Sequence, residues 1–124
     1  MPQYVIDDKW NLIKGPMSVQ EISVLANEYQ SKYFSSPEPS ITIEVTSNPE
    51  FQGAACYEPS AKKIWLAERV TEFEKTLKIA LLHEMIHANL HASGFIADHD
   101  HEHGPEFRAE VKRLMAAGAY DELL

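Results

Sequence analysis

The spacing of apolar positions predicts three helices in this chain. Apolar residues recur every three or four positions over residues 19–34 and again over residues 72–92. A third such stretch begins near Pro105, which suits the first turn of a helix, and Gly118 suits its end. Capping-box pairs precede the first two helices and support their starts. These pairs are Ser18 with Glu21, and Thr71 with Glu74.

The pattern changes to strict alternation between the first two helices. Ile41, Ile43 and Val45 alternate with polar residues, which indicates a half-buried strand. Two short apolar runs, residues 54–57 and 63–66, are separated by five residues and predict a β-hairpin. We therefore expect an α+β fold in which a small, mostly antiparallel sheet of three to four strands packs against the helices. The first seventeen residues read as short strand-like pieces or as an arm packed on the domain.

Length and composition favour one globular domain over residues 1–124. The apolar fraction of 44% is ordinary for a folded protein. Cys56 is the single cysteine, so an internal disulfide and a cysteine-based zinc ribbon are excluded, and we expect this thiol to be buried. The charged N-terminal residues do not resemble a signal peptide, and no apolar run has the length of a membrane span. We expect an intracellular, cytoplasmic protein that does not enter a membrane.

The net charge of the chain and the distribution of its charged residues indicate which partners it can bind. The formal net charge is −8, and the lysines and arginines are interleaved with glutamates along the chain. Proteins that rely on phosphate contacts usually carry a basic face. DNA is therefore possible as a partner but is not supported by the charge.

The second predicted helix contains a motif with a known physical mechanism. His83 and His87 are four residues apart, so they lie on one helix face and can offer two imidazole nitrogens to one metal ion. Glu84 stands beside them and can act on a water molecule as general base. Histidines and a glutamate on an otherwise apolar helix are costly to bury without partners, and a metal ion removes that cost. The H-E-x-x-H spacing predicts a catalytic site for one Zn²⁺ ion.

A catalytic zinc usually takes three protein ligands and leaves its fourth position to water. The continuation H-E-x-x-H-x-x-G-x-x-H is absent, because Leu90 and Ser93 occupy the glycine and histidine positions. His103 directly before the third helix is a good candidate, because a helix start holds its backbone. The residues alone leave several other third ligands open. These are Glu106, Asp98, His99 and His101.

Two short words in the sequence resemble a known family. The words are HEMIHA at residues 83–88 and HGPEF at residues 103–107, in this order and separated by a short loop. Together they resemble the SprT-like (Spartan-type) zinc metalloprotease domains over about residues 17–118. The words GAACY at residues 53–57 and IWL at residues 64–66 are similar in kind but less specific.

The resemblance implies a zincin-like fold with an active-site helix and a zinc-dependent endopeptidase. It implies His83, His87 and His103 as the zinc ligands and Glu84 as the catalytic acid/base. It also implies cleavage of proteins, in several members of proteins crosslinked to DNA. The alternative function is a non-catalytic, metal-stabilised module that binds protein or DNA. Tyr57 and His91 are candidates for stabilising the oxyanion that forms during hydrolysis.

Overall fold

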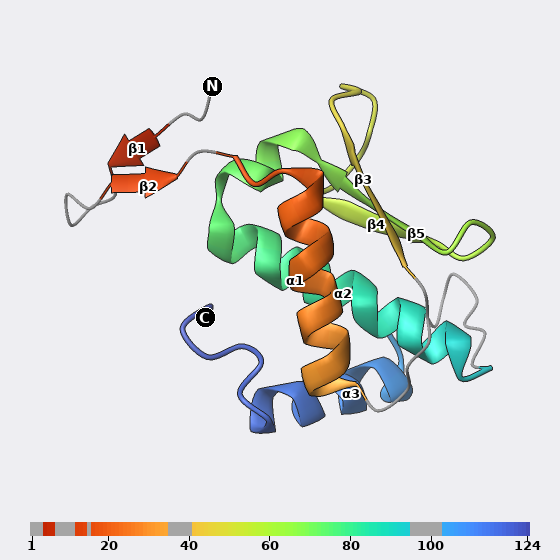
Figure 1. The fold of residues 1–124 in the computed structure, drawn as a ribbon. Coiled ribbons are helices and arrows are strands. Elements are labelled where there is room, and N and C mark those ends of the chain that lie inside the picture. Colours follow the sequence, from red (N-terminus) through yellow and green to blue (C-terminus); the bar gives the residue numbers. More distant parts are fainter. Residues whose placement is uncertain (1–3, 7–11, 15, 35–40, 95–102) are drawn as a thin grey trace.

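The computed structural model describes residues 4–6, 12–14, 16–34, 41–94 and 103–124. Within these ranges the chain forms three α-helices, one 3₁₀ helix, a three-stranded mixed sheet and a separate pair of short strands (Figure 1). The predicted α+β class is confirmed at this level.

The N-terminal strands β1 (Tyr4–Ile6) and β2 (Leu12–Lys14) pair with each other in antiparallel register. The sequence predicted either short strand-like pieces or a packed arm for the first seventeen residues, and the described part of this segment contains two short strands. These strands belong to a different sheet from the three that follow.

The first helix begins where its capping box predicts. Helix α1 (Val19–Tyr33) has Ser18 as its N-cap, and the hydroxyl of Ser18 accepts a hydrogen bond from the Glu21 amide at 3.1 Å. The Glu21 carboxylate in turn accepts from the Ser18 amide at 3.1 Å. Both bonds satisfy amides that the first helical turn leaves without intrahelical partners.

The main sheet differs from the prediction in the direction of one strand. Strands β3 (Thr42–Thr46), β4 (Ala55–Glu58) and β5 (Lys63–Ala67) lie in the order β3-β5-β4. The hairpin of β4 and β5 is confirmed as antiparallel, but β3 pairs with β5 in parallel. The prediction of a mostly antiparallel sheet is therefore wrong. Alternation of apolar residues determines which face of a strand is buried, but it does not specify the direction of the neighbour.

One face of the sheet packs on the helices and the other faces solvent. Ile64 and Leu66 point inward and are fully buried. On β4, Ala55 and Tyr57 pack against the core, so Cys56 between them lies on the outward face. Cys56 is exposed, and the expectation that it is buried is wrong because strand alternation outweighs the general preference of this residue type.

The start of the second helix also differs from the prediction. A 3₁₀ helix, η1 (Glu68–Glu72), comes first, and α2 (Glu74–Ala92) begins after Phe73. The Thr71 hydroxyl donates to the Glu68 carbonyl at 2.6 Å instead of capping α2. The predicted capping box of Thr71 with Glu74 is therefore absent, because Thr71 closes the 3₁₀ turn.

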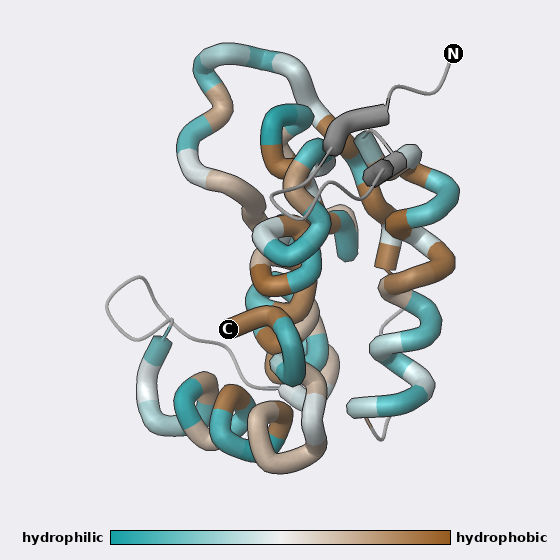
Figure 2. Tube along the Cα trace, turned by 90° about the vertical axis from the view of Figure 1, so that its left-hand side faces the viewer, coloured by the Kyte–Doolittle hydropathy of each residue, from teal (hydrophilic) through white to brown (hydrophobic). Residues whose placement is uncertain are grey.

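Helix α2 is the central element of the core. It contacts β4, β5, α1, η1 and the third helix. Short hydrophobic and hydrophilic stretches alternate along the tube of the helices, as expected for elements that bury only part of their surface (Figure 2). The fully buried residues of α2 are Leu77, Leu81, Leu82, Met85, Ile86 and Ala88.

Helix α3 (Pro105–Ala116) has Gly104 as N-cap and a proline in its first turn, as predicted. Gly118 follows with φ of +89°, the left-handed conformation that suits a helix end, so its predicted role is confirmed. Phe107 and Leu114 face the core. None of the helices in the described residues combines the length and apolar character needed to cross a membrane.

Candidate metal centre

Two of the predicted ligands project from the same side of α2. His83 and His87 are one helical turn apart, and their ring centroids are 5.1 Å apart. Both rings are half-buried, in contrast to the fully buried Met85 and Ile86 between them. The helical geometry therefore holds two imidazoles together at the surface of the core.

The third histidine comes from the residue before the N-cap of α3. The Nε2 atom of His103 lies 3.1 Å from Nε2 of His83 and 3.2 Å from Nε2 of His87. Each of the three residues offers one ligand atom, and these atoms all lie within 4.8 Å of one another. Helix α2 and the residue just before the N-cap of α3, which is twenty positions after His83 in the sequence, therefore bring three ring nitrogens to one point.

The chemistry of this nitrogen cluster fits a metal ion better than hydrogen bonds among the rings. A neutral ring nitrogen carries either one proton or one lone pair. The Nε2 atom of His103 can therefore make one full hydrogen bond, yet it is close to two nitrogens. Tetrahedral zinc with nitrogen ligands at about 2.0–2.1 Å separates those ligands by roughly 3.3 Å. The observed spacing is close to that value, so three lone pairs directed at one cation fit the arrangement.

A buried aromatic ring supports the three imidazoles. Phe107 is 6% exposed, and its ring centroid lies 4.8 Å from that of His83, 4.7 Å from His87 and 4.8 Å from His103. It sits one helical turn after His103 on α3. From the sequence, Phe107 was predicted to be an apolar residue of the third helix and the last residue of the HGPEF motif. Its contact with all three histidines was not predicted.

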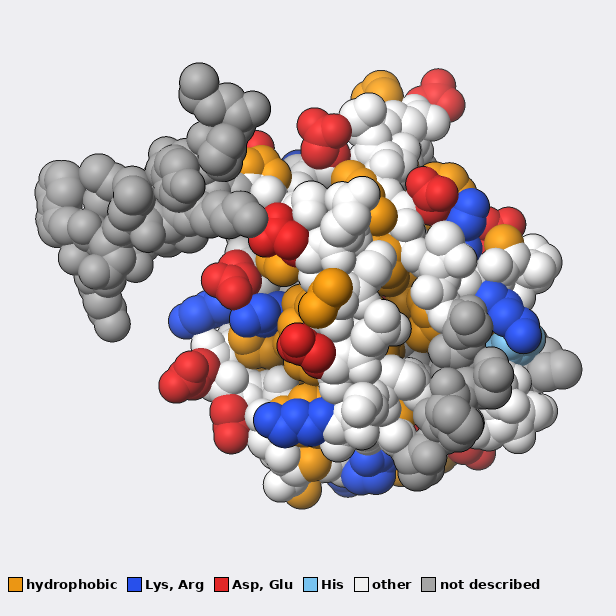
Figure 3. Space-filling model, viewed as in Figure 1, with side chains coloured by type: hydrophobic (Ala, Val, Ile, Leu, Met, Phe, Trp, Pro, Cys, Tyr) orange, Lys and Arg blue, Asp and Glu red, His pale blue; other side chains and the backbone are white. Residues whose placement is uncertain are grey.

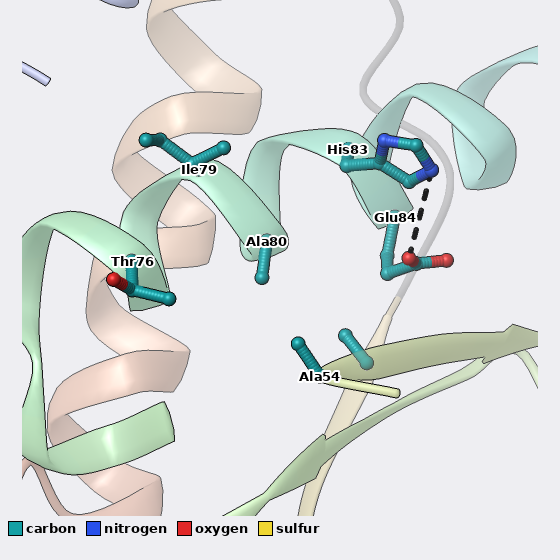
Figure 4. A pocket seen from close by; sticks show the side chains of 7 residues that line it. Ala54, Thr76, Ile79, Ala80, His83 and Glu84 are labelled. Atoms are coloured by element: carbon teal, nitrogen blue, oxygen red, sulfur yellow. Dashed lines mark ion pairs between the residues drawn. The ribbon is translucent and has the colours of Figure 1, made fainter. Parts of the chain in front are cut away.

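The carboxylate of Glu84 lies beside this cluster. Glu84 is 8% exposed, and its Oε2 atom is 3.9 Å from Nε2 of His83. Figure 4 shows the side chain directed from α2 toward the segment that carries Ala54, with the imidazole of His83 next to it. The carboxylate is thus close to the nitrogen cluster but beyond direct hydrogen-bonding distance of that nitrogen.

Glu84 and His83 also line an open hollow between α2 and β4. The hollow has a volume of about 370 Å³. Its other lining residues are Ala54, Ala55, Thr76, Ile79 and Ala80. A concave, mostly apolar surface with a few polar groups at one end is the usual form of a ligand site.

Helix α1 anchors both elements that supply the histidines. On α2, Asn89 exchanges two hydrogen bonds with Gln30 of α1, at 2.8 and 2.9 Å, and also donates to the Met85 carbonyl at 2.8 Å. On α3, Nη1 of Arg113 donates to the Tyr33 carbonyl at 2.7 Å, at the end of α1. The C-terminal half of α1 therefore connects to both helices around the cluster.

The two candidates for oxyanion stabilisation lie together, one on β4 and one on α2. The rings of Tyr57 and His91 meet edge to face with centroids 6.1 Å apart. The Tyr57 hydroxyl is buried and has no hydrogen-bond partner within the described part of the chain. Burial raises the pKa of Tyr57 above its ordinary value. Neither residue belongs to the nitrogen cluster found among the described residues.

The alternatives for the third ligand divide into two groups. Glu106 is exposed on the first turn of α3 and is not part of the cluster identified in the described residues. Asp98, His99 and His101 lie outside the described residues. His103 is thus the candidate that the described structure brings to His83 and His87.

A comparison with protein families adds an independent finding. The model of the SprT-like family matches residues 22–122, which include most of α1, the three-stranded sheet, α2, α3 and the histidine cluster. The chain belongs to the SprT-like family. No curated protein and no solved structure matches it. Membership of the SprT-like family indicates a metalloprotease-like domain, and the three adjacent histidines of this SprT-like chain are compatible with a bound metal ion such as zinc.

Proposed function

We propose that the chain is a zinc-dependent endopeptidase with a zincin-like arrangement of its active-site helix. The proposal assigns His83, His87 and His103 as ligands of one Zn²⁺ ion and Glu84 as the catalytic acid/base. The observation that supports it most strongly is the convergence of three imidazole nitrogens beside the carboxylate of Glu84. Membership of the SprT-like family supports the same chemistry.

The proposed mechanism divides the work between the ion and the chain. When bound, zinc would lower the pKa of water toward about 7 and would polarise a carbonyl oxygen. Glu84 takes a proton from the attacking water through a carboxylate oxygen and returns it to the leaving amine. Its burial keeps this carboxylate in a low-dielectric setting, where its electrostatic interactions are stronger than in water.

An extended polypeptide fits the surroundings of the site. Strand β4 is an edge of the three-stranded sheet, and the segment at its start, Ala54 and Ala55, lines the hollow that contains Glu84. An extended peptide can add to a sheet edge through backbone hydrogen bonds. The proposed substrate is therefore a flexible segment of a protein, laid along the edge of β4 and past Glu84.

The family resemblance extends the proposal to proteins that are associated with DNA or crosslinked to it. The net charge of −8 does not support direct phosphate contacts. On the face shown in Figure 3, the acidic and basic side chains of the described residues are interspersed. We therefore propose that the enzyme acts on protein. We do not expect it to bind free DNA through phosphate contacts, which would weaken strongly as the salt concentration rises.

The test compares the zinc-loaded protein with Glu84→Gln on an unfolded protein substrate. Glutamine keeps the shape of the side chain but cannot accept the proton, so cleavage should fall by about 10²–10⁴-fold. Zinc content, measured by elemental analysis, should stay the same. Equal cleavage by both proteins would refute the assignment of Glu84, and zinc binding without any cleavage would favour the non-catalytic binding module.

A further inference from the structure

The hollow beside Glu84 has a chemistry that differs from that of the histidine cluster. Its wall on the sheet side is formed by Ala54 and Ala55, and its wall on α2 includes Ile79 and Ala80. Figure 4 shows Ala80 and Glu84 on neighbouring turns of α2, both directed toward Ala54 across the hollow. The apolar part of the hollow thus adjoins the carboxylate proposed to act on the scissile bond.

Small side chains create this space. Three of its lining residues are alanines, which stop at Cβ and leave room between helix and strand. Thr76 is exposed and stands one turn before Ala80 on α2. Apart from His83 and Glu84, no lining residue carries a charge or an acidic group. Apart from the hydroxyl of Thr76, the surface available to a ligand away from Glu84 is therefore aliphatic.

The volume of the hollow indicates the size of the group that it takes. A closed apolar cavity of about 150 Å³ binds benzene. The hollow measures about 370 Å³ and is open on one side. It has room for a branched aliphatic side chain or one aromatic ring, together with part of the backbone that carries it.

We propose that this hollow is the specificity pocket of the enzyme and that it binds a large apolar side chain, such as Leu or Phe, directly adjoining the scissile bond. The inference rests on the proposed peptidase function. Because His83 and Glu84 form one end of the hollow, a residue seated there has its backbone next to the reacting groups. Ala80 determines the depth of the pocket, and Thr76 lines its exposed side.

The expected size of the preference follows from apolar burial. Each methylene that a hydrophobic pocket takes up changes the discrimination between substrates by about 10–200-fold. A partly open pocket gives less than the full value, so a Leu side chain should be favoured over Ala by about 10-fold or more in kcat/KM. A charged side chain at the same position should be disfavoured, because the aliphatic walls offer it no partner.

The experiment digests a mixture of unfolded proteins with the zinc-loaded enzyme and maps the cleaved bonds by mass spectrometry. Wild type should enrich Leu and Phe at one position beside the cleaved bond. Ala80→Leu fills the pocket and should shift that position toward Gly and Ala. Thr76→Leu, at an exposed site that tolerates bulk, should shift it in the same direction. Ala92→Leu, the same change at an exposed position on α2 away from the hollow, should keep the wild-type preference.

A binding measurement tests the pocket without catalysis. N-acetyl-leucinamide, titrated into alanine-methyl-labelled Glu84→Gln protein, should shift the NMR signals of Ala54, Ala55 and Ala80. N-acetyl-glycinamide should not shift them, and the signal of Ala92 should not move with either probe. Cleavage with no change of preference in both Ala80→Leu and Thr76→Leu would overturn the pocket and leave the peptidase proposal standing. Zinc-loaded wild type that cleaves nothing would instead overturn the peptidase proposal.

Discussion

The two sides of α2 use polar groups in opposite ways. Toward α1, the buried amide of Asn89 is satisfied within the protein by Gln30 and by the Met85 carbonyl. On the ligand side, His83 and His87 are half-buried and direct their nitrogens to a point shared with His103. On the side that faces α1, the polar group of Asn89 forms hydrogen bonds within the protein. On the other side, ring nitrogens from three histidines lie close enough together to bind one cation.

This difference teaches where to look for chemistry on a buried helix. A polar residue with reciprocal hydrogen bonds, such as Asn89, fixes how two helices pack and favours one arrangement. Polar residues of like type whose ligand atoms converge, such as the three histidines, indicate a ligand. Convergence, more than burial, therefore separates the candidate site from the structural core.

Of the changes that test the difference between the two sides of α2, replacement of a histidine in the cluster should have the largest effect, and the quantity affected is zinc affinity. His103→Ala removes one of three nitrogens from the cluster, so zinc affinity should fall by more than about 100-fold, which exceeds the loss usually seen when a supporting residue is replaced. Zinc at about 100 times its Kd should stabilise wild type by about 2.7 kcal/mol, and this gain should disappear in the variant. Competition with a chromophoric chelator and thermal unfolding with and without EDTA measure the two quantities. His91→Ala, on α2 outside the cluster, is the matched control and should keep both.

The next effect concerns the side of α2 that faces α1. Gln30→Ala removes the two hydrogen bonds between Gln30 and the buried amide of Asn89 and should lower the free energy of unfolding by about 1–3 kcal/mol. Zinc affinity measured below the unfolding transition should change little. Urea unfolding compares this variant with Gln20→Ala, at an exposed position of α1. A loss of zinc affinity larger than the loss of stability would break the comparison, because α1 would then control the ligand geometry directly.

The smallest effect depends on pH and also lies on the side of α1. Burial, with nearby Tyr33 and Glu74, raises the pKa of Tyr29 from 10.0 to about 12. A folded-state pKa above the unfolded one gives stability that is complete below pH 10 and is lost as the pH rises toward 12. Wild type should therefore lose stability over this range relative to Tyr29→Phe, which has no proton to release. Urea unfolding at a series of alkaline pH values measures the difference, and parallel curves would show that Tyr29 titrates as an exposed tyrosine does.

Local signals in the sequence predicted the local structure well. The Ser18 and Glu21 pair, the four-residue spacing of His83 and His87, and the stop at Gly118 each depend on residues within one or two helical turns. Thr71 was the exception, because the same hydroxyl can cap a helix or close a 3₁₀ turn. Pattern alone does not rank these two local hydrogen bonds.

Features that depend on distant contacts were less predictable. The parallel pairing of β3 with β5 requires the chain to cross to the far edge of the sheet before it returns, and no local residue encodes that path. The residues alone left the third ligand open between His103, Glu106 and the loop histidines, since the choice depends on how α3 packs on α2. The contact of Phe107 with all three imidazoles depends on the same packing.

The central claim is that three imidazoles hold one zinc ion whose remaining position is open to water. X-ray absorption at the zinc edge of the loaded protein tests it most directly. The account predicts one zinc per chain with three imidazole nitrogens at about 2.0–2.1 Å and one oxygen, and two imidazoles in His103→Ala. A zinc-free protein, or a ligand set that His103→Ala leaves unchanged, would contradict it.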